Sequence, residues 1–210
     1  GPGEKITFEV GWGFINAGTS YLSVLDTVLV DDNICWQIES RAHTNKVLSK
    51  LYPVNDSIIS LMDIKKLFSR GIKKRLREGT YKRDREYRIE PENSQVLKIS
   101  KGKVKKTRLL DHPVQDVLSA FYWVRTRDIK VGDVLHVEAI DNMKTYNLAV
   151  KVLKRETVKV KAGKFDCFKI QPIILGEGLF KAKGEIFVWI TADERRIPIK
   201  MKSKIFIGAI

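Results

Sequence analysis

Cysteine is scarce in this chain, and its placement excludes two kinds of site. Cys35 and Cys167 are the only cysteines among 210 residues, and they lie far apart in the sequence. This spacing fits neither a zinc-binding motif nor a CxxC redox pair. Both lie in apolar stretches, so we interpret them as small buried side chains. A disulfide between them is the alternative if the protein is exported.

Signatures of catalysis and of metal binding are also missing. The histidines His43, His112 and His136 form no HExxH motif and no pair at helical spacing. No G-x-S-x-G nucleophile motif is present. Gly11-Trp12-Gly13 and Gly176-Glu177-Gly178 do not open a helix after a strand, so we interpret them as bends. We therefore expect no enzymatic activity, no cofactor and no metal.

Long apolar runs and linkers are missing as well. No run approaches the roughly 18 apolar residues that suggest a membrane-spanning helix, so we expect no transmembrane segment. The chain has no low-complexity tract and no repeat at a fixed period. A chain of 210 residues fits one all-β domain of ordinary size. We expect a single β-barrel-like domain over residues 1–210.

Positive charge is abundant and unevenly spread. The formal net charge is +14, and residues 65–108 hold seventeen Lys or Arg and five Asp or Glu, a local net charge of +12. A concentrated positive field attracts nucleic acid, anionic lipid or acidic polysaccharide. The plainer interpretation is the solvated, lysine-rich surface of a basic β protein.

Alternation of apolar and polar residues predicts β-strands along most of the chain. The clearest strands are Ile6–Trp12, Thr19–Val30, Ile34–His43, Val54–Ser60, Thr80–Ile89, Val134–Ile140 and Tyr146–Leu153. Gln95–Leu109 has the pattern of two short strands, whereas Ile64–Gly79 is ambiguous. Asn45–Tyr52 has a weak helical spacing that ends at a proline.

The C-terminal part of the chain predicts two packed hairpins. Val158–Lys161 and Phe165–Ile174 flank one turn, and Gly184–Thr191 and Ile197–Ile207 flank a longer loop. Phe165–Ile174 and Gly184–Thr191 are apolar on both faces, so we expect them to be central strands. The last strand alternates apolar residues with lysines that should face solvent. These lysines are Lys200, Lys202 and Lys204.

One convincing helix interrupts the strands. Asp111-His112-Pro113 supplies a cap candidate and a proline suited to the first turn. Apolar residues then recur at helical spacing, namely Val114, Val117, Leu118, Phe121 and Val124. Because a sheet of many strands accumulates twist, we predict a mainly β fold. We expect a long antiparallel sheet curled into a barrel or half-barrel, with one main α-helix packed against it.

The basic strand Thr80–Ile89 contains the best candidate binding residues. Tyr81, Arg83, Arg85 and Tyr87 project from one face and interleave aromatic rings with guanidinium groups. This chemistry suits an anionic ligand, because Arg makes bidentate contacts to phosphate or carboxylate. It also suits stacking on nucleic-acid bases, the least favoured of the three readings. Cross-strand packing with cation–π support is the plainer reading.

Aromatic residues of the helix are a second candidate. Phe121 and Tyr122 lie on a helix that must cover the sheet. In an underfilled barrel they would line an apolar cavity, whereas in a filled barrel they belong to the core.

Several stretches resemble domain-of-unknown-function family 3108, a family of bacterial proteins expected to be exported. The matching pieces are Gly3–Val10, Ala17–Thr19, Arg77–Tyr81, Gln115–Tyr122, Ala162–Cys167 and Trp189–Pro198. The resemblance implies a removed signal peptide upstream of Gly1 and a place in the periplasm or at the outer membrane. It also implies a curved antiparallel sheet similar to those of envelope lipoprotein carriers and of the YmcC-like fold. It implies no site residues.

Two functions fit these features. The first is an exported protein that binds or carries an amphiphile or an anionic envelope polymer in an open barrel. The alternative is a structural or interaction module of an envelope complex, with a filled core and no ligand. We expect lipid or an anionic polymer as the partner and consider nucleic acid unsuited to an exported protein. The sequence identifies no protein partner.

Overall fold

The computed structural model describes residues 1–12, 15–175 and 185–204. Among these residues the chain is mainly β, with two antiparallel sheets and a single α-helix. The chain divides into two compact units, Gly1–Ser119 and Ala120–Ile210. The mainly β prediction is confirmed, while the single domain expected over residues 1–210 stays a prediction.

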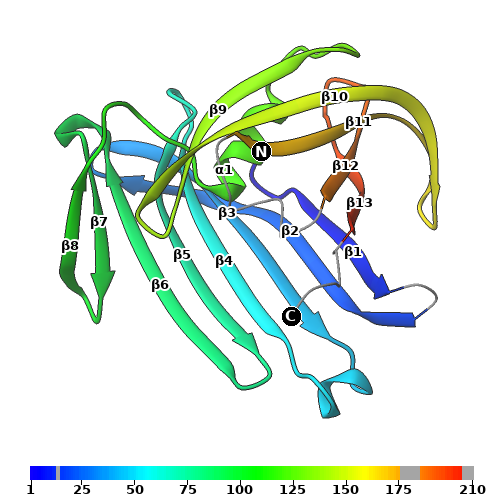
Figure 1. Cartoon of the computed structure of the whole chain (residues 1–210), viewed down its shortest axis with the longest axis horizontal. Coiled ribbons are helices and arrows are strands. Elements are labelled where there is room, and N and C mark those ends of the chain that lie inside the picture. Colours follow the sequence, from blue (N-terminus) through cyan, green and yellow to red (C-terminus); the bar gives the residue numbers. More distant parts are fainter. Residues whose placement is uncertain (13–14, 176–184, 205–210) are drawn as a thin grey trace. The chain divides into compact units, whose positions relative to one another are not determined.

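The first unit contains an eight-stranded sheet whose strands follow one another in chain order (Figure 1). The strands are β1 (Lys5–Trp12), β2 (Ile15–Val30), β3 (Asn33–Thr44), β4 (Asn55–Asp63), β5 (Ser69–Glu78), β6 (Tyr81–Glu90), β7 (Gln95–Ser100) and β8 (Lys103–Leu109). Short 3-10 turns, η1 (Leu48–Lys50) and η2 (Pro91–Asn93), interrupt them. The segment that the sequence left ambiguous therefore contains β5, between two other strands of the sheet.

The two faces of the first sheet differ in chemistry. We call one the apolar face, because it holds a set of side chains that are each less than 5% exposed. These are Val24, Ile38, Ile72, Tyr87 and Ile89. The other, the polar face, presents exposed charged side chains, among them those of Lys73, Arg75 and Asp84. The alternation seen in the sequence therefore separates a core side from a solvated side.

A buried carboxylate, Asp116, ties β4 and β5 to the start of α1 (Val117–Arg125). It accepts hydrogen bonds of 2.6 Å from the hydroxyls of Ser60 and Ser69. It also accepts the backbone N–H groups of Leu118 at 2.8 Å and Ser119 at 3.1 Å, as a helix N-cap does. Asp116 is fully buried, so these donors replace the water that its charge would otherwise need.

This cap corrects the predicted start of the helix. The sequence favoured Asp111 as the cap and Val114 as the first residue of the apolar stripe. The helix instead begins after Asp116, so Val114 precedes it and Val117 in its first turn is 54% exposed. Hydrogen bonds from distant residues, Ser60 and Ser69, to Asp116 therefore help to decide where the helix starts.

Arg70 forms the second buried polar cluster of this unit. Its side chain is 1% exposed and donates to both carboxylate oxygens of Glu92, at 2.6 and 2.8 Å. It also donates to Asp63 at 3.1 Å and lies 5.1 Å from the ring centroid of Phe68. Asp63 in turn accepts the backbone N–H groups of the turn that follows it. The cluster therefore joins β4, β5 and η2 on the polar-face side of the sheet.

The second unit contains a five-stranded sheet in the order β13-β12-β11-β10-β9. Its strands are β9 (Val134–Asp141), β10 (Lys144–Val160), β11 (Gly163–Leu175), β12 (Glu185–Thr191) and β13 (Pro198–Lys204). The strands β11 and β12 lie inside the sheet, as predicted from their apolar composition. The long hairpin of β10 and β11 is strongly bent (Figure 1), and its register shifts between Val152 and Lys154.

The helix contributes to the core of this second unit. Val124 of α1 packs in one cluster with apolar side chains of the sheet, including Val150, Ile170 and Ile190. In the last strand Lys200 and Lys202 are exposed, as predicted. The predicted extension over residues 205–207, the side chain of Lys204, and the positions Gly13, Gly176–Gly178 and Gly184 lie outside the described parts of the chain.

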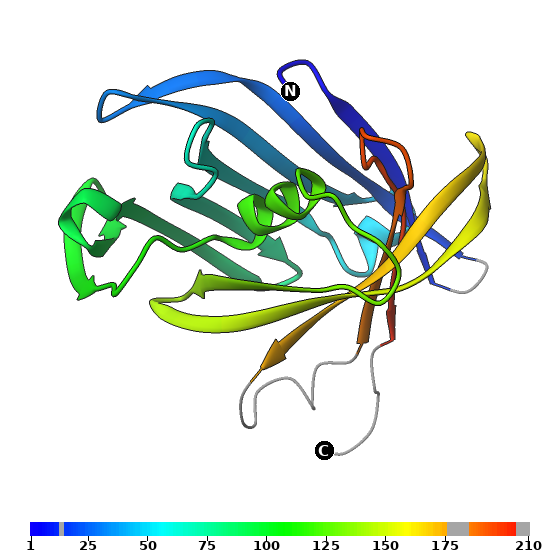
Figure 2. The ribbon, with the colours of Figure 1, turned by 90° about the horizontal axis from the view of Figure 1, so that it is seen from above.

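The predicted barrel is not confirmed, because the strands form two sheets and neither is closed. Strands β1 and β8 are the edges of the first sheet, and β13 and β9 are the edges of the second. After β8 the chain runs as an extended segment into α1 (Figure 2). Residues 110–133 hold this segment and the helix, so the strand ladder stops there instead of continuing from β8 to β9.

Both thiols are free and buried. Burial raises the pKa of Cys35 and that of Cys167 to about 11 each. A thiol with such a pKa carries little thiolate at neutral pH, so neither cysteine has the character of a nucleophile.

Replacing Asp116 tests the importance of the buried cap. We expect Asp116→Ala to lower the free energy of unfolding by roughly 3 kcal/mol, since several buried donors lose their acceptor. Asp116→Asn should lower it less, because the amide oxygen still accepts the helix N–H groups. Urea unfolding followed by tryptophan fluorescence measures both values. Equal stability of the wild type and Asp116→Ala would contradict this role.

The Arg70–Glu92 pair predicts a specific acid sensitivity. Hydrogen bonding to Arg70 lowers the pKa of Glu92 from 4.5 to about 2. The stabilisation is therefore complete above about pH 4.5 and is lost as the pH falls through about 2. We expect Glu92→Gln to be less stable at pH 7 and to lose less stability on acidification. The matched control is Glu194→Gln, which changes an exposed carboxylate and should retain the wild-type slope between these pH values.

Candidate functional site

One row of side chains crosses the apolar face and changes from apolar to cationic along its length. Directly paired residues of an antiparallel sheet lie on the same face, so the strand register defines the row. It runs over β1 to β6 through Ile6, Leu22, Ser40, Ile58, Lys74 and Arg85. The first four positions are mostly apolar, and the last two are cations directly opposite each other.

The neighbouring row changes in the same way, two strands further along the sheet. It runs over β2 to β8 through Val24, Ile38, Ser60, Ile72, Tyr87, Lys98 and Lys106. Lys98 and Lys106 are again directly opposite each other. We call the cations Lys74, Arg85, Lys98 and Lys106 the basic cluster. They come from four adjacent strands, β5 to β8, and all lie on the apolar face.

The basic cluster holds its charges in an unfavourable arrangement. Like charges directly opposite each other in a sheet destabilise it, and this cluster contains two such pairs. The side chains of Arg85, Lys98 and Lys106 form no ion pair with any residue in the described ranges. Lys74, Arg85 and Lys98 are nevertheless half-buried. An anion placed between Lys98 and Lys106 would relieve the repulsion of that pair.

Part of the positive charge on the polar face of the same strands is paired with carboxylates. Lys73 of β5 lies 3.7 Å from the carboxylate of Glu86 on β6. Arg77 lies 2.8 Å from Asp84, again between β5 and β6. The positive charge of residues 65–108 therefore lies on both faces of the sheet, and on the apolar face Arg85, Lys98 and Lys106 form no ion pair with any described residue.

Two acidic side chains, Asp56 and Glu78, lie on the apolar face over β4 to β8. Burial raises the pKa of Glu78, and the neighbouring carboxylate of Asp56 raises it further. Asp56 also accepts the backbone N–H of Arg77 at 2.7 Å. These two carboxyls therefore interact with each other and with the backbone near Glu78, the last residue of β5.

The candidate residues of the basic strand lie together on this face, as their spacing predicted. Tyr81 and Arg83 are exposed, with the guanidinium carbon 5.7 Å from the ring centroid. Arg85 belongs to the basic cluster, and Tyr87 is only 4% exposed. Tyr87 therefore has the position of a core residue, whereas Tyr81, Arg83 and Arg85 remain available as binding residues.

The other two candidates belong to the second unit. Phe121 is partly buried against the apolar cluster that includes Val124. Tyr122 is 5% exposed, and the guanidinium of Arg125 lies 4.7 Å from its ring centroid. Both residues therefore pack as core residues, which is one of the two alternatives expected from the sequence. Their proposed contact with a ligand stays a prediction.

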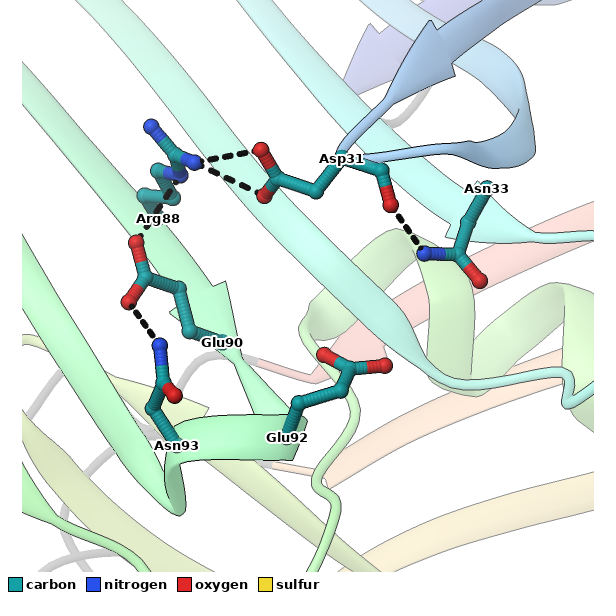
Figure 3. A pocket seen from close by; sticks show the side chains of 6 residues that line it. All are labelled: Asp31, Asn33, Arg88, Glu90, Glu92 and Asn93. Carbon is teal, nitrogen blue, oxygen red and sulfur yellow. Dashed lines mark hydrogen bonds and ion pairs between the residues drawn. The ribbon is translucent and has the colours of Figure 1, made fainter.

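A small polar pocket lies on the polar-face side of the first unit (Figure 3). Its volume is about 270 Å³, and its walls come from the turn before β3, from β6 and from η2. Arg88 in this pocket donates to both carboxylate oxygens of Asp31, at 2.6 and 2.7 Å, and contacts Glu90 at 3.1 Å. The lining holds more carboxylates than guanidinium groups, and Arg88 is already bonded to two of them, so the pocket does not suit an anionic ligand.

The described residues show no sign of a metal site or of a membrane-spanning helix. They contain no group of three or more His, Cys, Asp or Glu side chains that could hold a metal ion. None of their helices is long and apolar enough to cross a membrane. The basic cluster is therefore the arrangement with the clearest binding chemistry in these ranges.

Three members of the basic cluster were missed in the sequence, although their signal was present. Lys98 and Lys106 lie in the stretch predicted as two short strands, and Lys74 lies in the ambiguous stretch. The sequence shows that these residues are basic. Only the register shows that they share a face with Arg85 and with the apolar core.

The family-specific motifs lie elsewhere and have structural roles. Gln115 and Asp116 of one motif bond to the turn before β5 and to buried serines. In another motif, the indole N–H of Trp189 donates to Glu156, and the hydroxyl of Thr191 donates to Asp193. These contacts hold turns and strand ends in place.

We compared the chain with known protein families, curated proteins and solved structures. A family model described as a protein of unknown function, DUF3108, matches residues 7–210. No curated protein and no solved structure matches the chain. Because the family model covers nearly the whole chain, the chain belongs to family DUF3108.

Proposed function

We propose that this protein binds an anionic amphiphile, or an anionic polymer of the cell envelope, on the apolar face of its first sheet. The observation that carries this proposal is the row from Ile6 to Arg85. It passes from apolar side chains to a directly opposed pair of cations within one sheet face.

The two ends of this row match the two ends of an amphiphile. Ile6 and Ile58 are half-buried, so their remaining apolar surface can be covered by a hydrocarbon chain. Lys74 and Arg85 lie beyond them on the same face, where charge-assisted hydrogen bonds to phosphate or carboxylate can form. A ligand that lies along the row would place its chain and its head group at matching positions.

We propose that the ligand lies against half-buried side chains of the sheet face, such as Ile6, Ile58 and Lys74. Ligand cavities commonly hold about 300–1,000 Å³. The polar pocket of Figure 3 holds about 270 Å³ and has no apolar lining suited to a hydrocarbon chain. We therefore place the ligand on the sheet face.

We propose binding rather than catalysis for this site. The basic cluster consists of cations, and cationic side chains are sufficient to bind an anionic head group. Nucleic acid fits less well, because strands β7 and β8 contain no aromatic residue for base stacking.

The alternative is a structural or interaction module that binds no small ligand. The well-buried apolar face and the packed cluster of the second sheet favour it, since both cores are filled by the protein's own side chains. This alternative does not explain the like-charge pairs of the basic cluster, so we rank it second.

We also propose that the protein works in the periplasm or at the outer membrane. The support is the resemblance to a family of proteins expected to be exported. An anionic amphiphile or polymer is an abundant partner in that compartment, so the location and the binding chemistry agree.

Binding of dodecyl phosphate tests the site directly. We expect Lys74→Gln/Arg85→Gln to weaken binding by roughly tenfold or more, because each charge-assisted hydrogen bond contributes about 1.5–3 kcal/mol. Isothermal titration calorimetry measures the affinity. Mass spectrometry of solvent extracts from the purified protein identifies any natural ligand.

The matched control is Lys73→Gln/Lys82→Gln. It removes the same charge from the same two strands, but on the polar face. This variant should bind dodecyl phosphate as the wild type does. An equal loss of affinity in both variants would mean that only the net charge of the protein matters. If the wild type does not bind dodecyl phosphate, the structural module is favoured.

Export is tested with the complete gene in its natural host. We expect the protein in the periplasmic or outer-membrane fraction, detected with an antibody after fractionation and compared with a cytoplasmic marker enzyme. Recovery with the cytoplasmic marker would contradict the proposed location and leave the binding measurement unaffected.

A further inference from the structure

The two ends of the first sheet differ in charge. Because its strands are antiparallel and pair in chain order, every second connection lies at the same end of the sheet (Figure 1). One end, which we call the basic end, holds the described connections 45–54, 79–80 and 101–102, and none of these contains Asp or Glu. The connections at the opposite end are 31–32, 64–68 and 91–94, and they include Asp31, Asp32 and Glu92. The carboxylates of these connections therefore all lie at the opposite end.

The basic end carries an excess of positive charge. Four exposed lysines lie in its connections or directly beside them, namely Lys46, Lys50, Lys82 and Lys101. They form no ion pair with any residue in the parts of the chain that the structure describes. The carboxyls of Asp56 and Glu78, on adjoining strands, are half-buried and interact with each other. These lysines are therefore available to an anionic partner.

The same end exposes large apolar side chains on the connection between β3 and β4. Val47 is 74% exposed, Leu51 is 82% exposed and Tyr52 is 55% exposed. We call these three residues the apolar tip. No residue of η1, which lies between them, is buried. Single exposed apolar side chains are common, but a contiguous set of them marks an interaction site.

Hydrogen bonds hold the apolar tip in its exposed position. The side-chain oxygen of Asn45 accepts the backbone N–H groups of Val47 at 3.0 Å and Leu48 at 2.9 Å. The side-chain amide of Asn45 donates to the backbone carbonyl of Asn16 at 2.6 Å. The backbone N–H of Tyr52 donates to the carbonyl of Leu48 at 2.8 Å. The conformation of the loop itself therefore keeps these side chains in solvent.

The second connection of the basic end lies beside the apolar tip. The backbone N–H of Gly79 donates to the carbonyl of Pro53 at 2.7 Å. A Cβ atom added at Gly79 would lie only 2.8 Å from the ring of Tyr52. Lys82 follows this turn on β6. Apolar and cationic side chains of two hairpins thus form one surface.

We propose that the basic end docks onto an anionic membrane surface. The apolar tip enters the interfacial layer, where Val47 and Leu51 leave water and the ring of Tyr52 lies at head-group level. The four lysines lie beside the lipid phosphates, to which an anionic surface attracts them. A surface of uniform negative charge matches an end whose connections contain lysines and no carboxylate. The inference does not rest on the proposed ligand site, because it concerns other residues.

Vesicle sedimentation tests the docking. The wild type should bind vesicles of equimolar phosphatidylcholine and phosphatidylglycerol at least about tenfold more tightly than vesicles of phosphatidylcholine alone, because the lysines need anionic lipid. Val47→Ser/Leu51→Ser should weaken binding to the anionic vesicles roughly tenfold, since less apolar surface leaves water. Lys46→Gln/Lys50→Gln should also weaken it, by about tenfold. The fraction of protein that sediments at increasing lipid concentration measures each affinity.

Matched controls change the opposite end of the same sheet. Leu29→Ser/Ile34→Ser replaces two exposed aliphatic side chains beside the turn between β2 and β3. Lys65→Gln/Lys66→Gln removes two positive charges from the connection between β4 and β5. Both controls should bind anionic vesicles as the wild type does. Losses equal to those of the variants at the basic end would mean that net charge or general stickiness causes the binding, and would overturn the proposal.

A dye at the apolar tip reports which end meets the membrane. Leu51→Cys is labelled with an environment-sensitive dye, and labelling is selective because Cys35 and Cys167 are buried. Anionic vesicles should shift the emission of this dye to the blue. The same dye attached through Leu29→Cys should show no shift. Equal shifts at both positions, or no shift at position 51, would contradict the proposed orientation.

The outcomes also separate the docking from the proposed ligand site. Val47→Ser/Leu51→Ser should bind dodecyl phosphate as the wild type does, and Lys74→Gln/Arg85→Gln should still bind anionic vesicles. If the wild type does not bind anionic vesicles, the docking proposal fails and a protein partner is favoured for the basic end. That result would leave the dodecyl phosphate measurement unaffected.

Discussion

Cross-strand register is the constraint on which the arrangement of the first unit depends. Antiparallel pairing places directly opposed residues on one face, so a single slip of one residue would move each row to the other side. The buried apolar residues of β2 to β6 hold the register, because slippage would expose them. The same register then fixes the positions of Lys74, Arg85, Lys98 and Lys106. One geometric relation thus sets both the packing of the core and the positions of the proposed binding residues.

Two buried polar clusters reinforce this register at the ends of the strands. Asp116 holds Ser60 of β4 and Ser69 of β5 on the apolar face. Arg70, with Asp63 and Glu92, joins β4, β5 and η2 on the other side. Buried charges are costly unless every donor and acceptor finds a partner, so each cluster tolerates little displacement. Strand β5, which carries Lys74, is therefore held from both faces near its buried end.

The sequence predicted the strands better than their assembly, for a physical reason. Alternation within Thr80–Ile89 or Phe165–Ile174 is local, and the structure contains strands at both places. Closure into one barrel depends on pairing between distant strands, which local alternation does not encode. The start of α1 was misjudged for a similar reason, since Ser60 and Ser69 help to hold Asp116 from strands far away in the chain. The spacing within one strand was enough to predict that Tyr81, Arg83 and Arg85 share a face. Placing Lys98 and Lys106 on that face required the pairing register of the three strands β6, β7 and β8.

The uneven treatment of charge on the two faces argues against a purely solubilising role for the basic segment. Lysines on an edge strand such as β8 can protect a sheet from aggregation, and single exposed lysines need no other explanation. That function would be served equally well on either face. On the polar face, however, cations such as Lys73, Arg77 and Arg88 lie beside carboxylates. On the apolar face the cations oppose one another next to a hydrophobic core. Like charges directly opposite each other disfavour folding, and the anion binding that we propose would offset this cost.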